Sequence, residues 1–449
     1  MARSNFGKLG VILATAGSAV GLGNIWRFPT MAGQDGGSAF IILYLVCTLM
    51  LGLPGMIAEF IVGRHGSANA VRAYSAITGR KSWGILGAMG VLCASMILGF
   101  YSVVAGWCVY YLFASIMGQV NGDAEYVQTF FSNLMTDPLR PALMAVVFVG
   151  LTHFVVARGV KGGIEKAANI LMPMLFILLI ILVIASCSLP GASAGIEFLL
   201  KPDFSKVSSR VLLDAMGQAF FSLSLGTACL CTYASYFSRQ TNLLASSAQI
   251  ISIDCLIAIL AGLMIFPAAF SVGVNPDSGP SLIFITLPNV FQQAFGSVPV
   301  VAYVIGILFY ALLALAALTS TISMHEIGTA FLSEEAKISR STSAICITVL
   351  CGVIGVLCSW SLGAFPEVSL FGMPLFDSLD FVTGQILMPV GGFLTCLIIG
   401  WIVPTSIVKD EFTNWGTLPS TLFLAFLWTV RIICPTGIVI IFLNQFGII

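Results

Sequence analysis

The chain has 449 residues, of which 58% are hydrophobic and only 8% are charged, whereas about 25% of the residues of an ordinary soluble domain are charged. This composition excludes a disordered chain and argues against a soluble protein. The 19 basic and 19 acidic residues cancel, so the sequence offers no basic surface for nucleic acid. We therefore expect the lipid bilayer as the main partner and no nucleic acid.

Apolar runs between glycine, proline and charged residues predict an all-α polytopic membrane protein with a single transmembrane domain over residues 1–449. A helix needs about 20 apolar residues to cross the hydrocarbon core of a bilayer. Eleven runs meet this requirement. In chain order they are 8–33, 39–64, 84–115, 140–157, 163–189, 211–238, 243–269, 297–333, 341–363, 379–404 and 419–446.

The distribution of Lys and Arg predicts the orientation of these spans. With the N-terminus in the cytoplasm, most basic residues fall in cytoplasmic loops, as is typical of membrane proteins. The odd number of spans then places the C-terminus outside. We therefore expect a multi-pass protein of the cell inner (plasma) membrane with a cytoplasmic N-terminus.

The sequence lacks the patterns that are typical of enzymes. Its twelve cysteines lie mostly singly in apolar runs, and only three histidines accompany them, so we expect no zinc-type metal site. No nucleophile is paired with a base in any recognisable motif. We therefore expect no enzymatic activity and no catalytic residues.

Two spans carry glycine where a membrane helix would be continuous. The first span contains Gly17, Gly21 and Gly23, and the sixth contains Gly217 and Gly226. Because a glycine inside a helix costs about 1 kcal/mol relative to alanine, clustered glycines at mid-membrane depth predict broken helices. Broken helices that expose backbone groups are typical of the midplane sites of secondary transporters.

The sixth span follows the first by five spans, which indicates an internal repeat. A unit of five helices that is repeated in tandem enters the membrane in the opposite sense the second time, so the two copies are inverted. The expected units are repeat one at about 8–189, repeat two at about 211–404 and an eleventh helix at about 419–446.

Eight ordered motifs extend along nearly the whole chain. They are GSAVGLGNIWRFP (17–29), QDGGSAF (34–40), PGMIAEFIVGRHG (54–66), RGVKGGIEK (158–166), FFSLSLG (220–226), TYASY (232–236), LTSTIS (318–323) and DFVTG (380–384). With these motifs the chain resembles the neurotransmitter:sodium symporter family. The resemblance implies a LeuT-like fold of two inverted five-helix repeats plus an eleventh helix, and substrate uptake driven by sodium through alternating access.

The resemblance implies two bound sodium ions. The first ion would contact the carbonyl of Ala19, the side chains of Asn24, Ser222 and Asp254, and the substrate carboxylate. The family's better known bacterial member has Asn where this chain has Asp254, so this site would carry its own negative charge. An isolated carboxylate in a membrane is costly, and we favour an ion ligand over a protonated packing residue.

The second sodium ion would contact only neutral oxygen atoms. Its implied ligands are the carbonyls of Gly17, Val20 and Ala316 and the hydroxyls of Thr319 and Ser320. The alternative is that both hydroxyls bond only to the backbone of their own helix.

The resemblance also implies the residues that would hold an amino acid. Those for its carboxylate and ammonium groups are Ala19, Leu22, Gly23, Tyr101, Phe221, Ser222 and Ser224. Those around its side chain are Ser18, Leu22, Ile97, Tyr101, Phe221, Thr227, Ser320 and Met324. The monoamine branch of the family has Asp at the position of Gly21, so we expect an α-amino acid rather than an amine. Because no charge points into the pocket, we expect hydrophobic L-amino acids, aliphatic or aromatic.

Two charged pairs match the gates of the family. Arg27 and Asp380 match the extracellular gate, above a lid of Tyr101 and Phe221. On the intracellular side the implied gate residues are Arg3, Glu334 and Tyr236. The alternative for this second group is a charged terminus that is simply solvated.

The expected anion dependence rests on the seventh span. Chloride-dependent members have Ser at the position of Ala258 and chloride-independent members have Glu, but Asp254 lies one turn away and carries a negative charge. We therefore expect no chloride requirement; the alternative is a halide site lined by Tyr44, Gln218 and Ser222.

The favoured function is a sodium-coupled symporter for hydrophobic L-amino acids. One alternative is a proton-coupled carrier, with Asp254 and Glu59 as the proton relay. The other is a transporter-like sensor that binds substrate without turnover.

Overall fold

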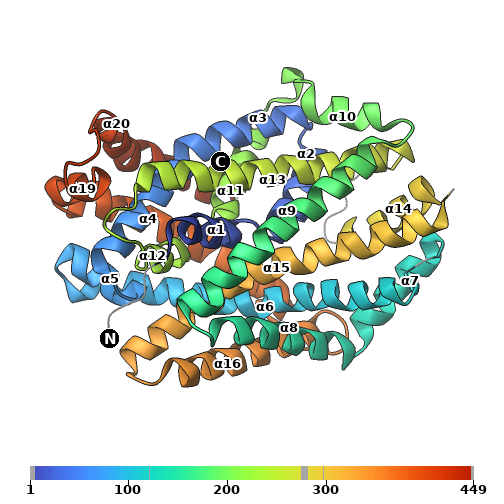
Figure 1. Ribbon diagram of the computed structural model, residues 1–449, viewed down its shortest axis with the longest axis horizontal. Helices are drawn as coiled ribbons and strands as arrows, with labels where there is room; N and C mark the ends of the chain where they lie inside the picture. Colours follow the sequence, from blue (N-terminus) through green and yellow to red (C-terminus); the bar gives the residue numbers. More distant parts are fainter. Residues whose placement is uncertain (1–5, 121, 275–281, 297, 446–449) are drawn as a thin grey trace.

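The computed structural model describes residues 6–120, 122–274, 282–296 and 298–445. Within these ranges, eight helices are long and apolar enough to cross a membrane, or up to ten if each of two bent helix pairs is one span. Most of the long helices run along the long axis of the molecule (Figure 1). A chain in lipid must satisfy its backbone groups internally, and helices do so within each span.

The first half of the chain contains the first five spans and their connections, with η denoting short π-helical or 3₁₀ segments. Its elements are α1 (Lys8–Ala19), η1 (Gly23–Arg27), α2 (Phe28–Gln34), α3 (Ser38–Cys47), η2 (Thr48–Gly52), α4 (Leu53–Gly66), α5 (Ala70–Thr78), η3 (Lys81–Trp83), α6 (Gly84–Ile116), α7 (Ala124–Thr136), α8 (Arg140–Val156), η4 (Val160–Glu165) and α9 (Lys166–Cys187).

The second half contains the remaining spans and a short antiparallel hairpin of β1 with β2. Its elements are α10 (Ala192–Leu200), η5 (Phe204–Lys206), α11 (Ser209–Ser222), α12 (Cys229–Ala234), α13 (Leu243–Ser271), η6 (Leu282–Thr286), α14 (Leu287–Phe295), α15 (Pro299–Glu335), α16 (Arg340–Ser361), β1 (Ser369–Leu370), β2 (Met373–Pro374), α17 (Leu375–Phe381), η7 (Val382–Leu387), α18 (Met388–Leu397), η8 (Ile398–Ile402), α19 (Thr405–Phe412), α20 (Phe423–Trp428), η9 (Thr429–Ile433) and α21 (Cys434–Gln445).

Each of the eleven expected spans coincides with a helix or a group of consecutive helices. The first span is a pair bent by 54°, and the fourth is α8, which meets α7 at 76°. The sixth is divided into α11 and α12, and the break leaves neither piece long enough to cross a membrane. The tenth span begins earlier than expected, at Leu375 directly after the hairpin, and the eleventh begins later, at Phe423.

Polar side chains cap the starts of several helices. The side chains of Asn69, Asp123, Ser208, Asn242 and Ser339 each accept a hydrogen bond from a backbone amide in the first turn of the helix that follows. Such caps satisfy amides that have no partner within the helix, and each contributes about 1 kcal/mol. The sequence therefore sets the start of these helices locally.

The broken first span lies in the middle of the bundle. Figure 1 shows α1 with α11 and α13 on one side and α6 and α15 on the other. The helix α1 packs directly against α9, α13 and α15, and α6 packs against α8, α15 and α16. Backbone groups released by a break in α1 therefore face side chains of several other spans.

Candidate functional site

The first span is interrupted where α1 ends, at Val20. The carbonyl of Val20 accepts hydrogen bonds from the hydroxyls of Thr319 and Ser320, each at 3.2 Å. On the other side of the interruption, the amide of Leu22 donates to the hydroxyl of Tyr101 at 3.0 Å. The break therefore presents backbone oxygen and nitrogen atoms to side chains of the third and eighth spans.

The sixth span is interrupted between α11 and α12, over residues 223–228. Ser224, Gly226 and Ala228 have φ angles of 54°, 81° and 60°. These angles lie in the left-handed region, which residues other than glycine rarely adopt. The amide of Gly226 donates to Glu59 Oε1 at 2.6 Å. A buried carboxylate of the second span therefore stabilises this break.

Gly226 is the residue of this break at which we expect glycine to be the hardest to replace. A Cβ atom there would lie 2.1 Å from the carbonyl oxygen of Met388 on α18, and the φ angle of 81° is itself strained for alanine. We expect Gly226→Ala to reduce the free energy of unfolding by about 1–3 kcal/mol or more, measured by thermal unfolding in detergent. The matched control is Gly217→Ala on α11, where nothing lies within 4 Å of the added Cβ. Equal melting temperatures of the two variants would contradict this expectation.

Asp254 on α13 accepts three hydrogen bonds close to the break of the first span. Its carboxylate accepts from Asn24 Nδ2 at 2.7 Å, from Ser222 Oγ at 2.8 Å and from the hydroxyl of Tyr44 at 3.0 Å. All four side chains are buried, and Ala19, the remaining expected protein ligand, is the last residue of α1. The structure thus brings Asn24, Ser222 and Asp254 together and adds Tyr44 to the group.

The hydrogen bonds around Asp254 also indicate how the side chain of Asn24 is oriented. The amide of Gly21 donates to Asn24 Oδ1 at 3.1 Å, so the Nδ2 group of Asn24 is the one that faces Asp254. Both carboxylate oxygens of Asp254 then accept from donors. That Asp254 is an ion ligand rather than a protonated packing residue stays a prediction.

The residues expected around the second ion lie where α1 contacts α15. The hydroxyl of Thr319 is 3.2 Å from the Val20 carbonyl and 2.9 Å from the Ala316 carbonyl of its own helix. Ser320 also reaches Val20, and a Cβ atom on Gly17 would lie 3.4 Å from Thr319 Cβ. Both hydroxyls therefore reach the break, so neither bonds only to the backbone of its own helix, and their role as sodium ligands stays a prediction.

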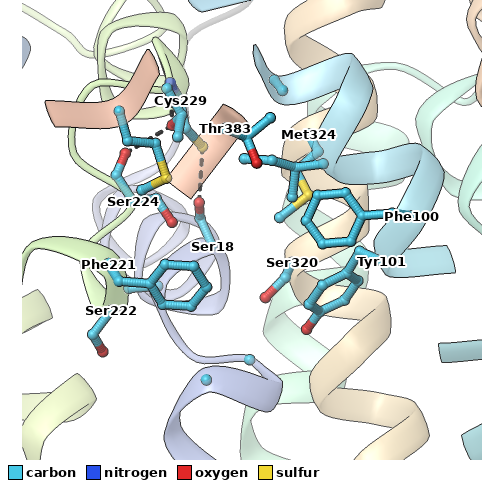
Figure 2. Close-up of a pocket in the computed structure, with 17 residues that line it drawn as sticks. Ser18, Phe100, Tyr101, Phe221, Ser222, Ser224, Cys229, Ser320, Met324 and Thr383 are labelled. Carbon is cyan, nitrogen blue, oxygen red and sulfur yellow. Dashed lines mark hydrogen bonds between the residues drawn. The ribbon is translucent and has the colours of Figure 1, made fainter. Parts of the chain in front are cut away.

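A cavity of about 60 Å³ lies between the two breaks, and none of the described residues that line it is charged (Figure 2). The expected substrate residues that line it are Ser18, Ala19, Gly23, Ile97, Tyr101, Phe221, Ser222, Ser224, Thr227, Ser320 and Met324. Leu22 is the exception, because it lines the larger cavity next to this one. Three lining residues also belong to the groups of expected ion ligands: Ala19 and Ser222 to the first group and Ser320 to the second.

The larger cavity has a volume of about 410 Å³ and is lined by both Arg27 and Asp380. Tyr101 and Phe221 line both cavities and therefore lie between them. The Arg27 guanidinium lies 4.2 Å from the centre of the Phe221 ring. These two charged residues, both in the described part of the chain, form no ion pair within 4 Å. The expected gate residues thus share one cavity without being in direct contact.

Of the residues expected at the intracellular gate, Arg3 is outside the described residues. Glu334 Oε2 accepts hydrogen bonds from the amide and the side chain of Asn69 at 2.8 and 3.0 Å. The hydroxyl of Tyr236 donates to Glu326 Oε1 at 2.6 Å. The contact of Tyr236 with Glu326 adds an acidic residue that we did not single out from the sequence.

Glu326 is fully buried and forms an ion pair with Arg340 through both of its carboxylate oxygens. The signal for it was present in the sequence, because an acidic residue inside the eighth span is rare enough to indicate a specific partner. Its partner was not evident, because Arg340 lies at the start of the next helix, among residues expected in a loop.

The small cavity between the two breaks is also lined by residues that we did not assign to it from the sequence. These are Ala94, Phe100, Cys229, Thr383 and Met388. Cys229 lies beside the second break, and its sulfur is 2.8 Å from the hydroxyl oxygen of Ser18. Thr383 belongs to the motif DFVTG, which we had connected only with the gate.

Comparison with known proteins identifies the family. The model of the sodium:neurotransmitter symporter family matches residues 3–129 and 134–448. The chain belongs to this family. It is 38% identical over 445 residues to an uncharacterized sodium-dependent transporter, YhdH, of Bacillus subtilis, covering 98% of this chain and 97% of that protein. It is 33% identical over 457 residues to an uncharacterized sodium-dependent transporter of Haemophilus influenzae, with the same coverage of both.

The structure of this sodium:neurotransmitter symporter is similar to a crystal structure of MhsT in complex with L-phenylalanine. The TM-score is 0.89 at 39% sequence identity, covering 98% of this chain and 99% of that chain. The all-α, LeuT-like fold expected from the sequence is thereby confirmed. The chain is a sodium-dependent, multi-pass membrane transporter and not an enzyme.

Proposed function

We propose that this transporter is a sodium-coupled symporter that takes up hydrophobic L-amino acids, aliphatic or aromatic, by alternating access. The observation that carries this proposal is the small cavity between the two helix breaks, which adjoins Asp254 through Ser222 and is lined by no charged side chain. L-phenylalanine, the ligand of the similar MhsT structure, belongs to this class of substrate.

The backbone of the first break would bind the α-carboxylate of the substrate. The amide of Leu22 donates to the Tyr101 hydroxyl, so an amide and a hydroxyl hydrogen lie close together at the cavity. Carbonyl groups at the second break would accept from the substrate ammonium group. Gly21 carries no side chain, and a Cβ atom there would lie 2.5 Å from Ser320 Oγ. There is therefore no acidic side chain at Gly21 to replace a carboxylate that an amine lacks.

Two sodium ions would be co-transported with the substrate. Asn24, Ser222 and Asp254, together with the Ala19 carbonyl and the substrate carboxylate, would hold the first ion, so its binding is coupled to that of the substrate. Gly17, Val20, Ala316, Thr319 and Ser320 would hold the second ion through neutral oxygen atoms. Neutral ligands suit an ion that is released in each cycle.

We propose that transport does not require chloride. The hydroxyls of Tyr44 and Ser222, which would otherwise be available to an anion, both donate to the carboxylate of Asp254. A chloride ion at this position would meet a negative charge of the protein within a few ångströms and would be repelled.

Alternating access requires that the cavity open to one side at a time. Arg27 and Asp380 would close the side of the larger cavity by forming an ion pair across it, and Arg3, Glu334 and Tyr236 would act at the other end. A solvent-exposed charge pair contributes only about 0–1 kcal/mol, which suits a contact that breaks in every cycle. We propose that the N-terminus is cytoplasmic, that the C-terminus is outside, and that the protein resides in the plasma membrane.

Uptake by the purified full chain in liposomes tests the proposal. We expect an inward sodium gradient to drive accumulation of several hydrophobic amino acids out of all twenty, and no accumulation when choline replaces sodium. Uptake should persist when gluconate replaces chloride. Loss of uptake in gluconate would contradict chloride independence, and binding only of glycine, alanine or charged amino acids would contradict the substrate class.

The same preparation distinguishes the two alternative functions. Accumulation that follows a proton gradient while the sodium concentration is equal on both sides of the membrane would indicate a proton-coupled carrier. Sodium-dependent binding that never leads to accumulation would indicate a substrate sensor. Empty liposomes and liposomes with equal sodium on both sides serve as controls.

A further inference from the structure

The tenth span contributes two residues to the wall of the small cavity. Thr383 lies in η7 and Met388 is the first residue of α18, and both side chains are buried. In the view of Figure 2, Thr383 and Met324 lie at the upper end of the cavity, and Ser222 and Tyr101 lie at the lower end. The end near Ser222 adjoins the expected ion ligands, so the end near Thr383 is where a substrate side chain would lie.

The tenth span reaches the cavity because its backbone packs directly on the second break. A Cβ atom on Gly226 would lie 2.1 Å from the Met388 carbonyl oxygen, and one on Gly391 would lie 2.5 Å from the Gly226 carbonyl oxygen. No side chain can be inserted between the two backbones at this contact. The distance between the break and α18 is therefore set by main-chain contact, and this contact holds Met388 beside the cavity that it lines.

Thr227 leaves this side of the cavity open. Its hydroxyl donates to the Ser224 carbonyl at 2.7 Å and accepts from the amide of Cys229 at 3.3 Å. The side chain is thus held against the backbone of its own loop. Because threonine is short and is held in this way, it fills little of the cavity, whose lining also includes Thr383 and Met388 of the tenth span.

The two residues of the tenth span present mainly apolar surface. The hydroxyl of Thr383 is 2.8 Å from the Leu379 carbonyl, one turn earlier in its own helix, which satisfies its hydrogen. Met388 and Met324 both line the cavity, and methionine side chains adapt readily to ligands of different shapes. The wall is therefore suited to contact with a hydrocarbon side chain, and its volume limits the size of that side chain.

We propose that Thr383 and Met388 are specificity-determining residues that set how large a substrate side chain the cavity accepts. This inference rests on the proposed function, because it assumes that an amino acid occupies the cavity. Smaller residues at either position favour aromatic substrates over aliphatic ones, and a larger residue at Thr383 excludes aromatic substrates. The hydroxyl of Thr383 takes no part in this selection.

Binding of L-leucine and L-tryptophan to the purified full chain in sodium tests the proposal, with the ratio of the two Kd values as the readout. Loss of one or more methylene groups from a pocket changes discrimination by about tenfold or more. We expect Met388→Ala and Thr383→Ala to shift the ratio about tenfold toward tryptophan. Thr383→Met should shift it at least about tenfold toward leucine, and Thr383→Val should leave it unchanged.

The controls are a methionine and a threonine that face away from the site. Met174 on α9 is exposed, and Thr429 in the eleventh span donates to the carbonyl four residues earlier, as Thr383 does. Met174→Ala and Thr429→Val should keep the ratio of the wild-type protein. A ratio that stays within twofold of wild type in every variant that still binds an amino acid, or that shifts in Thr383→Val, would overturn the inference.

The outcome separates this inference from the proposed function. If the wild-type protein binds no amino acid in sodium, the proposed function fails. If the wild-type protein binds both amino acids and the three size-changing variants do not move the ratio, only the role of the tenth span fails. Because the ratio is taken within one protein, a partial loss of folded material does not affect it.

Discussion

Replacing Asp254 by alanine is expected to abolish sodium-dependent substrate binding. The substitution removes the negative charge and leaves three buried donors, on Asn24, Ser222 and Tyr44, without their shared acceptor. A lost hydrogen bond to a charged group costs about 1.5–3 kcal/mol, and each 1.4 kcal/mol corresponds to about a tenfold change in affinity. We therefore expect apparent sodium affinity to fall by more than about 100-fold, measured as the sodium dependence of amino acid binding.

A milder variant shows whether the charge or only the shape of Asp254 matters. Asp254→Asn keeps one oxygen acceptor but removes the charge, so we expect about a tenfold loss of sodium affinity with binding retained. The control is Ser247→Ala on the same helix, a buried hydroxyl for which the described residues provide no hydrogen-bond partner. Wild-type sodium affinity in Asp254→Ala would show that the carboxylate is not an ion ligand.

Replacing Arg340 by alanine is expected to cause the largest loss of stability. Its partner, Glu326, is fully buried and would retain only the hydroxyl of Tyr236. Removal of one partner of a buried ion pair costs about 3–5 kcal/mol, because an uncompensated charge remains. We expect a clear decrease in the melting temperature of the purified protein in detergent.

The exposed pair of Arg72 with Glu335 provides a matched control. Their side chains are 47% and 33% exposed, and such pairs contribute about 0–1 kcal/mol, so Arg72→Ala should change the melting temperature little. The double variant Arg340→Ala with Glu326→Gln should recover part of the loss, because it also removes the buried charge. Equal losses in Arg340→Ala and Arg72→Ala would show that burial does not govern the strength of the pair.

The glycine pattern located both broken helices but not the residues at which they break. Gly21 and Gly226 lie in the interruptions, whereas Gly17 and Gly217 remain inside α1 and α11. Composition indicates where a helix is weak. Which glycine leaves the helical conformation depends on the partners that the released backbone finds, such as Glu59 at Gly226.

The candidate ion ligands were expected from the resemblance to a known family, and their roles remain predictions. Asn24, Ser222 and Thr319 lie in motifs that resemble those of a known family, so their roles could be transferred residue by residue. The part of Tyr44 was different: we had considered it only as a halide ligand, and the structure places its hydroxyl on Asp254. The spacing of residues along one span does not show which side chain of another span contacts a buried carboxylate.

The order of residues along the chain was sufficient to predict that it crosses the membrane, approximately where its spans lie, which two of them are broken, and which charged residues lie inside them. These properties follow from local physics, because lipid requires each apolar segment to satisfy its own backbone. Three features became evident only once the helices were packed: Tyr236 contacts Glu326, Arg27 and Asp380 are apart, and the tenth span lines the cavity. Such contacts depend on how each helix is rotated and how deeply it is placed against its neighbours, and this is set by close packing between segments far apart in the chain.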